Sequence, residues 1–513
     1  MASYMNKAEV EAHAEELSIF ELPRTFTSVE KIYYEDTRPT SQITTENSPV
    51  EFNVYGQGID YIDLQRTKLH VKAKITKADG SILTKDEKVG PVNLWLQSLW
   101  SQVDLTLNGK LITTSTNLYP YKSYLKVLLN GTSTAKESSL QSQLYYKDDA
   151  QDIDSSDPIT GINSGLANRG ALCETSHTVD MEGPLYEDFF DIKRYLINGV
   201  NLQIKLFRTR PSFSLLAGED NPDYKVKIED VYLRICKVRP NTAIITAHAK
   251  TLQDTEAKYP FTRSDIKVAS IPKGQLSFTW DHLFQNKCPN KVVVALVSAE
   301  AVNGSYTKNP FNFAMYDLDT IALYVNGESL PAQPLHVGNN QYISAYNSLF
   351  EGRESIGLDV SREDFSSGYA LYQFTLEPYH LKDGYLDLIK RGNLRLDLQF
   401  KKALPETVNC LIYSEDNLLL QIDGSQERLV CRTMNTLQLE CALNADPVTR
   451  HVRVYAADEL PQYRLTHFPR GFIVNTEPST MRGQHWVAIW LDSANHGEFF
   501  DSFGNQRPFL ETV

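Results

Sequence analysis

The feature that most constrains the fold of this sequence is an internal repeat. A segment with strand character (VDLTLNGKLI) leads into an Asn-Gly turn at Asn108, and a similar segment (TIALYVNGESL) does the same at Asn326, an offset of 218 residues (326 − 108). A second pair follows in the same order: YLINGVNLQIKLF contains Asn201 and LIKRGNLRLDLQF contains Asn393, an offset of 192 (393 − 201). Asn-Gly between alternating strands is typical of β-hairpins. The two ordered pairs indicate a duplicated domain, and chance similarity between Asn-Gly hairpins is the alternative explanation.

The sequence around these anchors predicts β-structure. Short segments such as 50–55 and 68–75 alternate apolar and polar side chains, so each presents one face to a core. The 27 Tyr and 22 Phe side chains suit half-buried pleated surfaces. Helical patterns are rare; within the β-rich region the candidates are 119–130 and an apolar stripe formed by Val92, Leu96, Leu99, Trp100 and Val103. We therefore predict a mainly β chain of two tandem β-sandwiches.

The two offsets differ by 26 residues (218 − 192), which assigns the extra residues to the first copy. The surplus falls in 131–170, a segment rich in Ser, Asp and Gly without a sustained period, and we expect it to be a long surface loop. The predicted order is a helical arm at 1–17, a first sandwich at 18–243 with this excursion, a helix-prone connector at 239–262, a second sandwich at 244–430, and a segment of different character at 434–513.

Charge and composition exclude several classes of protein. The 64 acidic and 51 basic residues give a net charge of −13, which argues against a dedicated nucleic-acid binder, because phosphate backbones require a clustered basic face. No signal-like start and no long apolar run suggest secretion or membrane spanning, so an intracellular chain is expected. The six cysteines share no CxxC spacing and are expected to be reduced, mostly buried thiols.

We expect neither a cofactor nor a metal ion. Gly56 and Gly58 follow a strand as in a dinucleotide-binding turn, but Tyr61 occupies the place of the third glycine and no helix follows. Cys173 and His177 are four residues apart, and no second pair at metal-binding spacing accompanies them.

The segment after residue 434 contains one candidate catalytic pair. The stretch GQHWVAIWLDSANHGEFFDSFG predicts a β-hairpin, and a turn centred near Ser493 would place His485 opposite or diagonal to Asp501. A carboxylate that orients a neutral imidazole is the base half of a nucleophilic triad, which also requires a Ser or Cys nucleophile. The alternative is a structural hairpin whose His and Asp lie at its ends.

Five longer segments resemble a known family: GPVNLWLQSLWSQVDLTLNGKL, YPYKSYLKVLLNG, NGSYTKNPFNFAMYDLDTIALYVNG, SREDFSSGYALYQFTLEP and IKRGNLRLDLQFKKAL. They are similar to the major capsid proteins of Maverick/Polinton elements and adintoviruses, and the similarity covers about residues 18 to 424. The resemblance implies a double jelly-roll fold, homotrimers, an icosahedral shell, and a minor, penton-like capsid protein as a further partner. It would place the chain in a virion capsid assembled inside the host, in the nucleus or the cytoplasm. On that basis the excursion at 131–170 would be an outward tower or a clasp between subunits.

The tail resembles the N-terminal half of the adenovirus-type cysteine protease (adenain) carried by the same elements. The resemblance assigns the base role to His485 in GQHWVAIW and the orienting role to Asp501 in FFDSFG. The family also requires a downstream Gln and a nucleophilic Cys, neither of which follows Asp501 before Val513, and Cys431 and Cys441 lie outside any matching motif. We therefore expect no enzyme activity from this incomplete protease-like segment and expect it to be marginally folded or loosely docked.

The sequence leaves three functions open. The first is a structural capsid protein of a Maverick/Polinton-type integrated viral element. The second is a capsid–cysteine protease fusion with peptidase function, against which the missing nucleophile argues. The third is a host β-sandwich binding protein domesticated from such an element.

Overall fold

The computed structural model describes most of the chain. It leaves out residues 1–24, 41–47, 285–286, 352–357, 378–389, 424–428, 433–452, 457–469, 476–485, 494–495, 502–505 and 510–513, and after residue 423 only the side chain of Phe472 is described. The predicted arm at 1–17 therefore lies outside the described residues.

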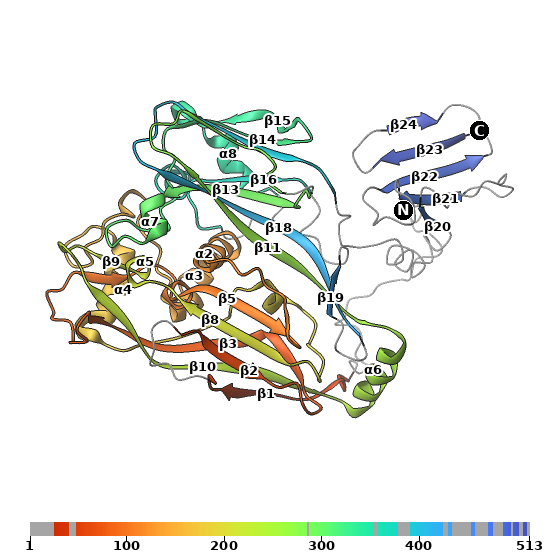
Figure 1. The fold of residues 1–513 in the computed structure, drawn as a ribbon, viewed down its shortest axis with the longest axis horizontal. Coiled ribbons are helices and arrows are strands. Elements are labelled where there is room, and N and C mark those ends of the chain that lie inside the picture. Colours follow the sequence, from red (N-terminus) through yellow and green to blue (C-terminus); the bar gives the residue numbers. More distant parts are fainter. Residues whose placement is uncertain are drawn as a thin grey trace, which may run out of the picture.

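The first sandwich consists of two four-stranded antiparallel sheets (Figure 1). The strand order is β1-β10-β3-β7 in one sheet and β2-β8-β5-β6 in the other. The strands are β1 (Val29–Thr37), β2 (Val50–Val54), β3 (Tyr61–Lys77), β5 (Trp100–Leu107), β6 (Lys110–Leu111), β7 (Val179–Gly183), β8 (Leu202–Arg208) and β10 (Tyr224–Pro240), with β4 (Val89–Pro91) and β9 (Leu215–Ala217) paired as a short accessory ladder.

The second sandwich repeats this topology. Its sheets have the orders β11-β18-β13-β16 and β12-β17-β14-β15. If the eight principal strands of each sandwich are numbered along the chain, both sandwiches have the orders 1-8-3-6 and 2-7-4-5, an eight-stranded jelly roll. The strands are β11 (Ala257–Ile271), β12 (Ser277–Trp280), β13 (Lys291–Ser298), β14 (Leu318–Val325), β15 (Glu328–His336), β16 (Leu371–Thr375), β17 (Leu394–Phe400) and β18 (Val408–Ile422), and β19 (Leu429–Arg432) extends the first sheet beside β18.

The anchors that revealed the repeat occupy equivalent places in the two jelly rolls. Asn108 and Asn326 both lie in the tight turn between the fourth and fifth principal strands, with positive φ values of 44° and 53°. Each side chain accepts a hydrogen bond from the backbone N–H of its second anchor, Asn201 at 2.7 Å and Asn393 at 2.9 Å. Each backbone N–H donates in return to the carbonyl of that same residue, at 2.9 Å in both copies. The duplication predicted from sequence is confirmed down to individual hydrogen bonds.

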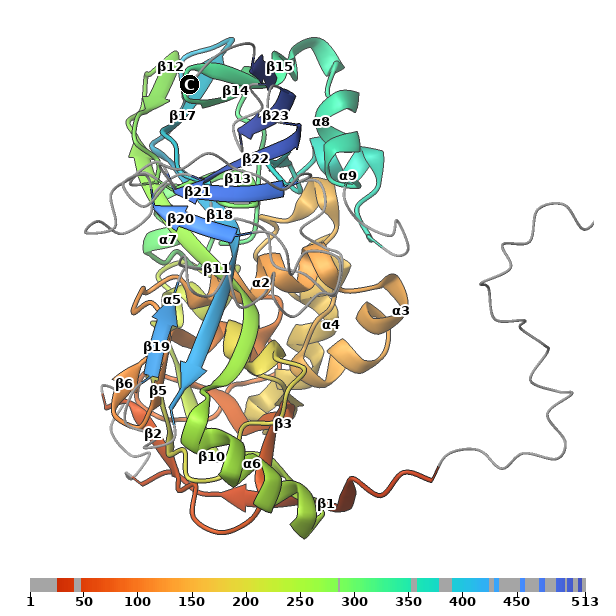
Figure 2. The same cartoon turned by 90° about the vertical axis from the view of Figure 1, so that its right-hand side faces the viewer.

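Helices occupy the connections between strands. α2 (Tyr119–Asn130) forms where its apolar stripe predicts it, and α6 (Thr242–Asp254) forms in the connector between the sandwiches. α6 lies low in both views, directly before the start of β11, whose long strand runs upward into the second sandwich (Figures 1 and 2). The remaining helices are α1 (Trp95–Ser98), α3 (Ser133–Lys136), η2 (Ser139–Gln143), η3 (Ala150–Asp152), α4 (Ser164–Cys173), η4 (Glu174–Ser176), η5 (Asp188–Asp191), α5 (Pro211–Ser214), α7 (Ala299–Asn303), η6 (Gly338–Asn340), α8 (Ile343–Ser348) and α9 (Arg362–Ser366).

The prediction of a helix over the apolar stripe at 92–103 is mostly wrong. Only the single turn of α1 is helical, and the chain enters β5 at Trp100. β5 pairs with β8 along its length, from Trp100 opposite Arg208 to Leu107 opposite Leu202. Pairing in the sheet overrides a helical pattern that the sequence also permits.

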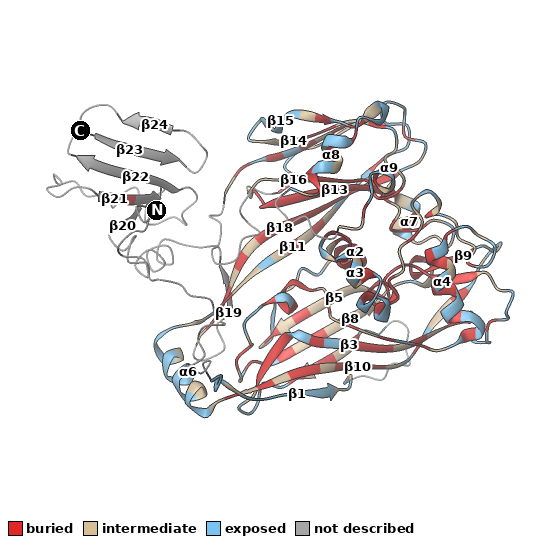
Figure 3. Cartoon of the chain, turned by 180° about the vertical axis from the view of Figure 1, so that it is seen from behind, coloured by how far each residue is buried: buried red, intermediate tan, exposed pale blue. Residues whose placement is uncertain are grey.

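Two buried clusters form the core, and each contains residues of both sandwiches. The first contains apolar residues of α2 together with β13, β16 and β18 of the second sandwich. β13 is buried at every position, as Figure 3 shows for this part of the molecule. Strands covered on both faces read as continuous apolar runs, which explains the sequence KVVVALVS.

The C-terminal strands form a separate five-stranded sheet in the order β20-β21-β22-β23-β24. The expected hairpin is present within residues 486–501 as the antiparallel pair β22–β23, with Val487 opposite Asp501, two residues along from the expected register; His485 lies outside the described residues. The strands are β20 (Arg453–Ala456), β21 (Arg470–Asn475), β22 (Trp486–Ser493), β23 (His496–Asp501) and β24 (Gln506–Phe509).

Candidate functional site: the buried junction between the two sandwiches

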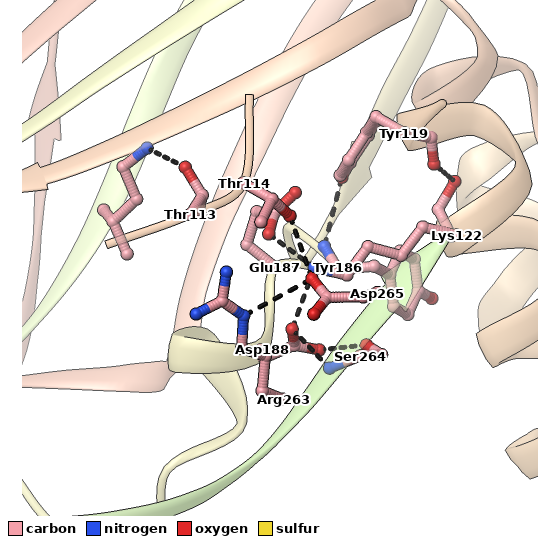
Figure 4. Close-up of polar contacts among 12 residues, drawn as sticks. Thr113, Thr114, Tyr119, Lys122, Tyr186, Glu187, Asp188, Arg263, Ser264 and Asp265 are labelled. Carbon is pink, nitrogen blue, oxygen red and sulfur yellow. Dashed lines mark hydrogen bonds and ion pairs between the residues drawn. The ribbon is translucent and has the colours of Figure 1, made fainter. Parts of the chain in front are cut away.

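Two clusters of buried charged and polar side chains connect the first sandwich to the second. The first contains Lys122, which lies in the first turn of α2. Its Nζ donates to Glu187 Oε2 at 2.7 Å and to Asp188 Oδ2 at 2.8 Å, at the start of η5 (Figure 4). All three residues are buried, with exposed fractions of 8%, 4% and 6%.

Asp188 carries the contact to the second sandwich. The backbone N–H of Ser264, in β11, donates to Asp188 Oδ2 at 2.9 Å, and the Ser264 hydroxyl donates to Oδ1. Lys126, one turn after Lys122 on α2, approaches Oδ1 at 3.3 Å and also pairs with Asp191. A single carboxylate therefore joins α2, η5 and β11.

Burial and charge act in opposite directions on this cluster. Burial alone would raise the pKa of Asp188, but Lys122 and Lys126 outweigh it and lower that pKa. Burial raises the pKa of Glu187 despite its contact with Lys122. For Lys122, burial disfavours the charged form, but attraction to Asp188 and Glu187 outweighs burial and raises its pKa.

The second cluster is built on the excursion at 131–170. Arg169, in α4, is fully buried and donates to Asp148 Oδ1 at 2.6 Å and to the carbonyl of Pro91 at 2.9 Å. Asp148 in turn accepts from Asn309 Nδ2 at 3.2 Å, and its carbonyl accepts from the Tyr369 hydroxyl at 2.8 Å. Asn309 and Tyr369 belong to the second sandwich.

Further contacts of the excursion reach the same sandwich. The Lys147 Nζ lies 2.8 Å from Asp364 Oδ2 and 3.2 Å from Asp359 Oδ1. The backbone N–H of Asn309 donates to Asp154 Oδ1 at 2.8 Å. The expectation of a surface loop is therefore wrong. The segment folds into α3, η2, η3 and α4 and lies between the two jelly rolls, because its scattered apolar and charged side chains are buried against both.

Aromatic rings complete the junction. The rings of Tyr124 in α2 and Phe311 in the second sandwich stack with centroids 4.0 Å apart. Tyr121 meets the edge of Phe311 at 5.9 Å and of Phe213 at 5.8 Å. Apolar stacking and buried hydrogen-bonded charges thus act together at this junction, which we call the seam between the sandwiches. The arrangement fixes the orientation of one jelly roll relative to the other.

The structure does not describe the side chains of the candidate catalytic pair at the C-terminus. His485 lies outside the described residues, and Asp501 is placed by its backbone alone, paired with Val487 in the β22–β23 hairpin. The cysteines considered as substitutes, Cys431 and Cys441, have no described side chain. The assignment of a base and an orienting acid stays a prediction.

The described residues also bear on metal binding, membrane spanning and free thiols. Within them, no group of three His, Cys, Asp or Glu side chains is placed to hold a metal ion, and no helix combines the length and apolar character needed to cross a membrane. Cys173, Cys236, Cys288 and Cys410 are buried and free, and burial raises the thiol pKa of Cys173 to about 12 and of Cys288 to about 11.

The charged residues of the junction were not predicted from the sequence. A signal was present: Lys122 and Lys126 interrupt the apolar stripe of YPYKSYLKVLLN one helical turn apart, and Glu187 and Asp188 directly precede the two phenylalanines of EDFFDI. Charges within apolar runs indicate buried partners, because an unpaired buried charge is strongly destabilising.

The chain matches no protein-family model. It is 26% identical over 403 residues to an uncharacterized protein of Caenorhabditis elegans, a match that covers 74% of this chain and 93% of that protein.

Two solved structures are similar in fold. A chain of the Sputnik virophage has a TM-score of 0.54 at 13% identity, covering 84% of this chain and 95% of that one. The Faustovirus major capsid protein has a TM-score of 0.52 at 11% identity, covering 79% of this chain and 92% of that one. The fold class is the double jelly roll predicted from sequence.

Proposed function

We propose that this chain is the major capsid protein of a Maverick/Polinton-type integrated viral element, forming homotrimers that tile an icosahedral shell. The observation that carries the proposal is a pair of jelly rolls with one strand order, held together by a buried junction. The fold is that of the Faustovirus major capsid protein, and the long motifs of the sequence resemble the capsid proteins of these elements.

The geometry suits a tiling subunit. Three copies around a threefold axis present six similar jelly rolls, which approximate a hexagon and can pack with six neighbours. Such tiling requires the angle between the two rolls to be constant, since a hinged pair would not close a regular ring. The buried contacts of Asp188 with Ser264 and of Asp148 with Asn309 supply that constraint.

The outer surface of the first sandwich is also suited to a shell protein. Its sheet β1-β10-β3-β7 carries alternating charges that pair with one another: Arg234 contacts Asp36 at 3.0 Å and Glu182 at 2.7 Å, and Arg239 contacts Asp60 at 2.8 Å. These pairs neutralise several basic side chains of the sheet, and the net charge of −13 opposes non-specific binding to nucleic acid before assembly.

In this proposal the C-terminal segment has no catalytic function. His485 and Asp501 match the base and the orienting acid of the adenain-like protease family, and residues 434–513 contain no motif that matches the nucleophilic Cys of that family, so these residues alone supply two of the three triad groups and no cofactor is proposed for them. The partners are further copies of this chain and a minor, penton-like capsid protein, and the location is a virion inside the host cell.

Light scattering during size-exclusion chromatography of the purified full chain tests the proposal. The expected species is a trimer with three times the 58.2 kDa mass of the chain, with larger assemblies as concentration rises. A strictly monomeric chain at every concentration would contradict a capsid role and would favour the domesticated binding protein.

A further inference from the structure

We propose that Lys122 and Asp188 join covalently in an intramolecular isopeptide bond, with Glu187 transferring the proton. The bond would link Lys122 of α2 to Asp188 at the start of η5, next to the contact between Asp188 and Ser264 of β11. It does not depend on the proposed capsid function.

The reacting groups are already in contact. Lys122 Nζ lies 2.8 Å from Asp188 Oδ2, so the nitrogen is at contact distance from the carboxyl group it would attack. Both side chains are more than nine-tenths buried and contribute to a packed helix and a packed turn. Holding two reactants in one geometry replaces a bimolecular encounter with an intramolecular step, which raises the effective concentration by several orders of magnitude.

The carboxyl group of Asp188 is held for attack. Oδ1 accepts from the Ser264 hydroxyl and faces Lys126 at 3.3 Å, and Oδ2 accepts from the Ser264 backbone N–H at 2.9 Å. When the lysine nitrogen adds to the carboxyl carbon, negative charge develops on an oxygen. Fixed donors around that oxygen stabilise the tetrahedral intermediate in the way an oxyanion hole does.

Glu187 is placed to move the proton. Its Oε2 accepts from Lys122 Nζ at 2.7 Å, and burial raises its pKa, so it can hold a proton that the lysine gives up. The neighbouring ammonium of Lys126 opposes a charge on Lys122. The charged pair predominates, so the bond forms slowly through the minor neutral pair, and one event per chain is sufficient.

The reaction is a condensation and balances without a co-reactant. A bond forms between Lys122 Nζ and Asp188 Cγ, and the bond between Cγ and one carboxyl oxygen breaks. Glu187 takes a proton from the attacking nitrogen and returns it to the departing oxygen. One water molecule leaves, and no electron is transferred.

The isopeptide bond would stabilise the seam between the two sandwiches. The loop between the two residues contains the whole excursion at 131–170, so the bond would close a covalent ring around the segment that clasps the second sandwich. A shell protein gains resistance to unfolding from such a ring, because cross-linking restricts the unfolded chain.

The mass of the intact, denatured full chain tests this inference. The wild-type chain is expected to be lighter than its sequence mass by one water molecule, and tandem mass spectrometry should find one branched peptide containing Lys122 and Asp188. Lys122→Arg keeps the positive charge but cannot form this amide, so it should have its full sequence mass. Lys68→Arg, on the exposed surface of β3, is the matched control and should keep the loss.

Two results would overturn the inference. One is a wild-type chain at full sequence mass. The other is a loss that persists in Lys122→Arg, which would point to dehydration at an Asp-Gly sequence such as Asp79-Gly80 instead. Glu187→Gln tests the proton transfer: it should fold, as judged by circular dichroism, and remain at full mass for much longer. Unchanged cross-linking in folded Glu187→Gln would contradict the role given to Glu187.

Discussion

At the residue scale, the seam between the sandwiches depends on charges that are buried and paired. Arg169 is fully buried, and its guanidinium connects Asp148 to the carbonyls of Pro91 and Tyr146. Removal of one member of a buried pair leaves the other charged and without compensation. Stability at this seam is therefore concentrated in a few side chains.

Replacement of Arg169 tests this view. Arg169→Met should lower the free energy of unfolding by about 3–5 kcal/mol, because Asp148 would stay buried without its cation. Urea denaturation followed by fluorescence measures the change. Arg395→Met removes a half-exposed partner of Asp397 and should cost less than about 1 kcal/mol. Equal losses in the two variants would refute the buried seam as the main contributor.

A pH dependence follows from Asp364, whose carboxylate contacts Lys147 across the seam. Burial alone would raise its pKa, but the hydrogen bonds from Lys147 and from Ser361 lower it. A group with a depressed folded pKa contributes stability above its unfolded pKa of about 3.9, and that stability is lost as the pH falls through the folded value.

Wild-type protein should therefore lose more stability between about pH 7 and about pH 3 than Asp364→Asn does. Urea midpoints measured at both pH values for both proteins give the difference. Parallel losses in wild type and variant would show that Asp364 does not contribute.

At the element scale, equivalent Asn-Gly turns with the same backbone conformation occur in both sandwiches. Asn108 and Asn326 adopt positive φ, followed by Gly109 and Gly327 at 78° and 92°, as a tight hairpin turn requires. Asn108→Ala and Asn326→Ala should each cost about 1–3 kcal/mol, since alanine disfavours this backbone region and loses a hydrogen bond to the second anchor. Asn→Asp at either position keeps the acceptor and should cost less. Chemical denaturation compares the four variants.

The excursion gives a second prediction at this scale. Ile153 is 2% exposed, and its Cδ1 lies 2.3 Å from where a Cβ on Gly368 of the second sandwich would be, whereas Ile162 is 69% exposed. Ile153→Ala should cost about 2–5 kcal/mol and speed proteolytic cleavage within 131–170. Ile162→Ala should change neither. Similar cleavage rates would restore the surface-loop interpretation.

These elements also show how far the sequence could be interpreted. Period-two strands, Asn-Gly turns and the apolar stripe of 119–130 are local patterns, so the two sandwiches, their turns and α2 were predictable. The excursion was not, because its polar composition resembles a loop and its partners, Asn309 and Tyr369, lie far away in sequence. Long-range pairing decides such segments, and no local pattern records it.

At the scale of the whole molecule, the shared core predicts cooperative behaviour. One buried cluster contains α2 of the first sandwich and β13 of the second, so neither sandwich retains its full core without the other. Calorimetry of the full chain should show one transition for the two sandwiches together. Two well-separated transitions for them would indicate independent domains and would contradict a rigid seam.

We propose that two equivalent jelly rolls, fixed at one angle, make this chain a unit of a closed shell. Electron microscopy of the purified full chain can test this geometry. We expect particles with threefold symmetry and six lobes around the rim, two from each subunit. Class averages that show only isolated two-lobed molecules, at concentrations where capsid proteins assemble, would contradict it.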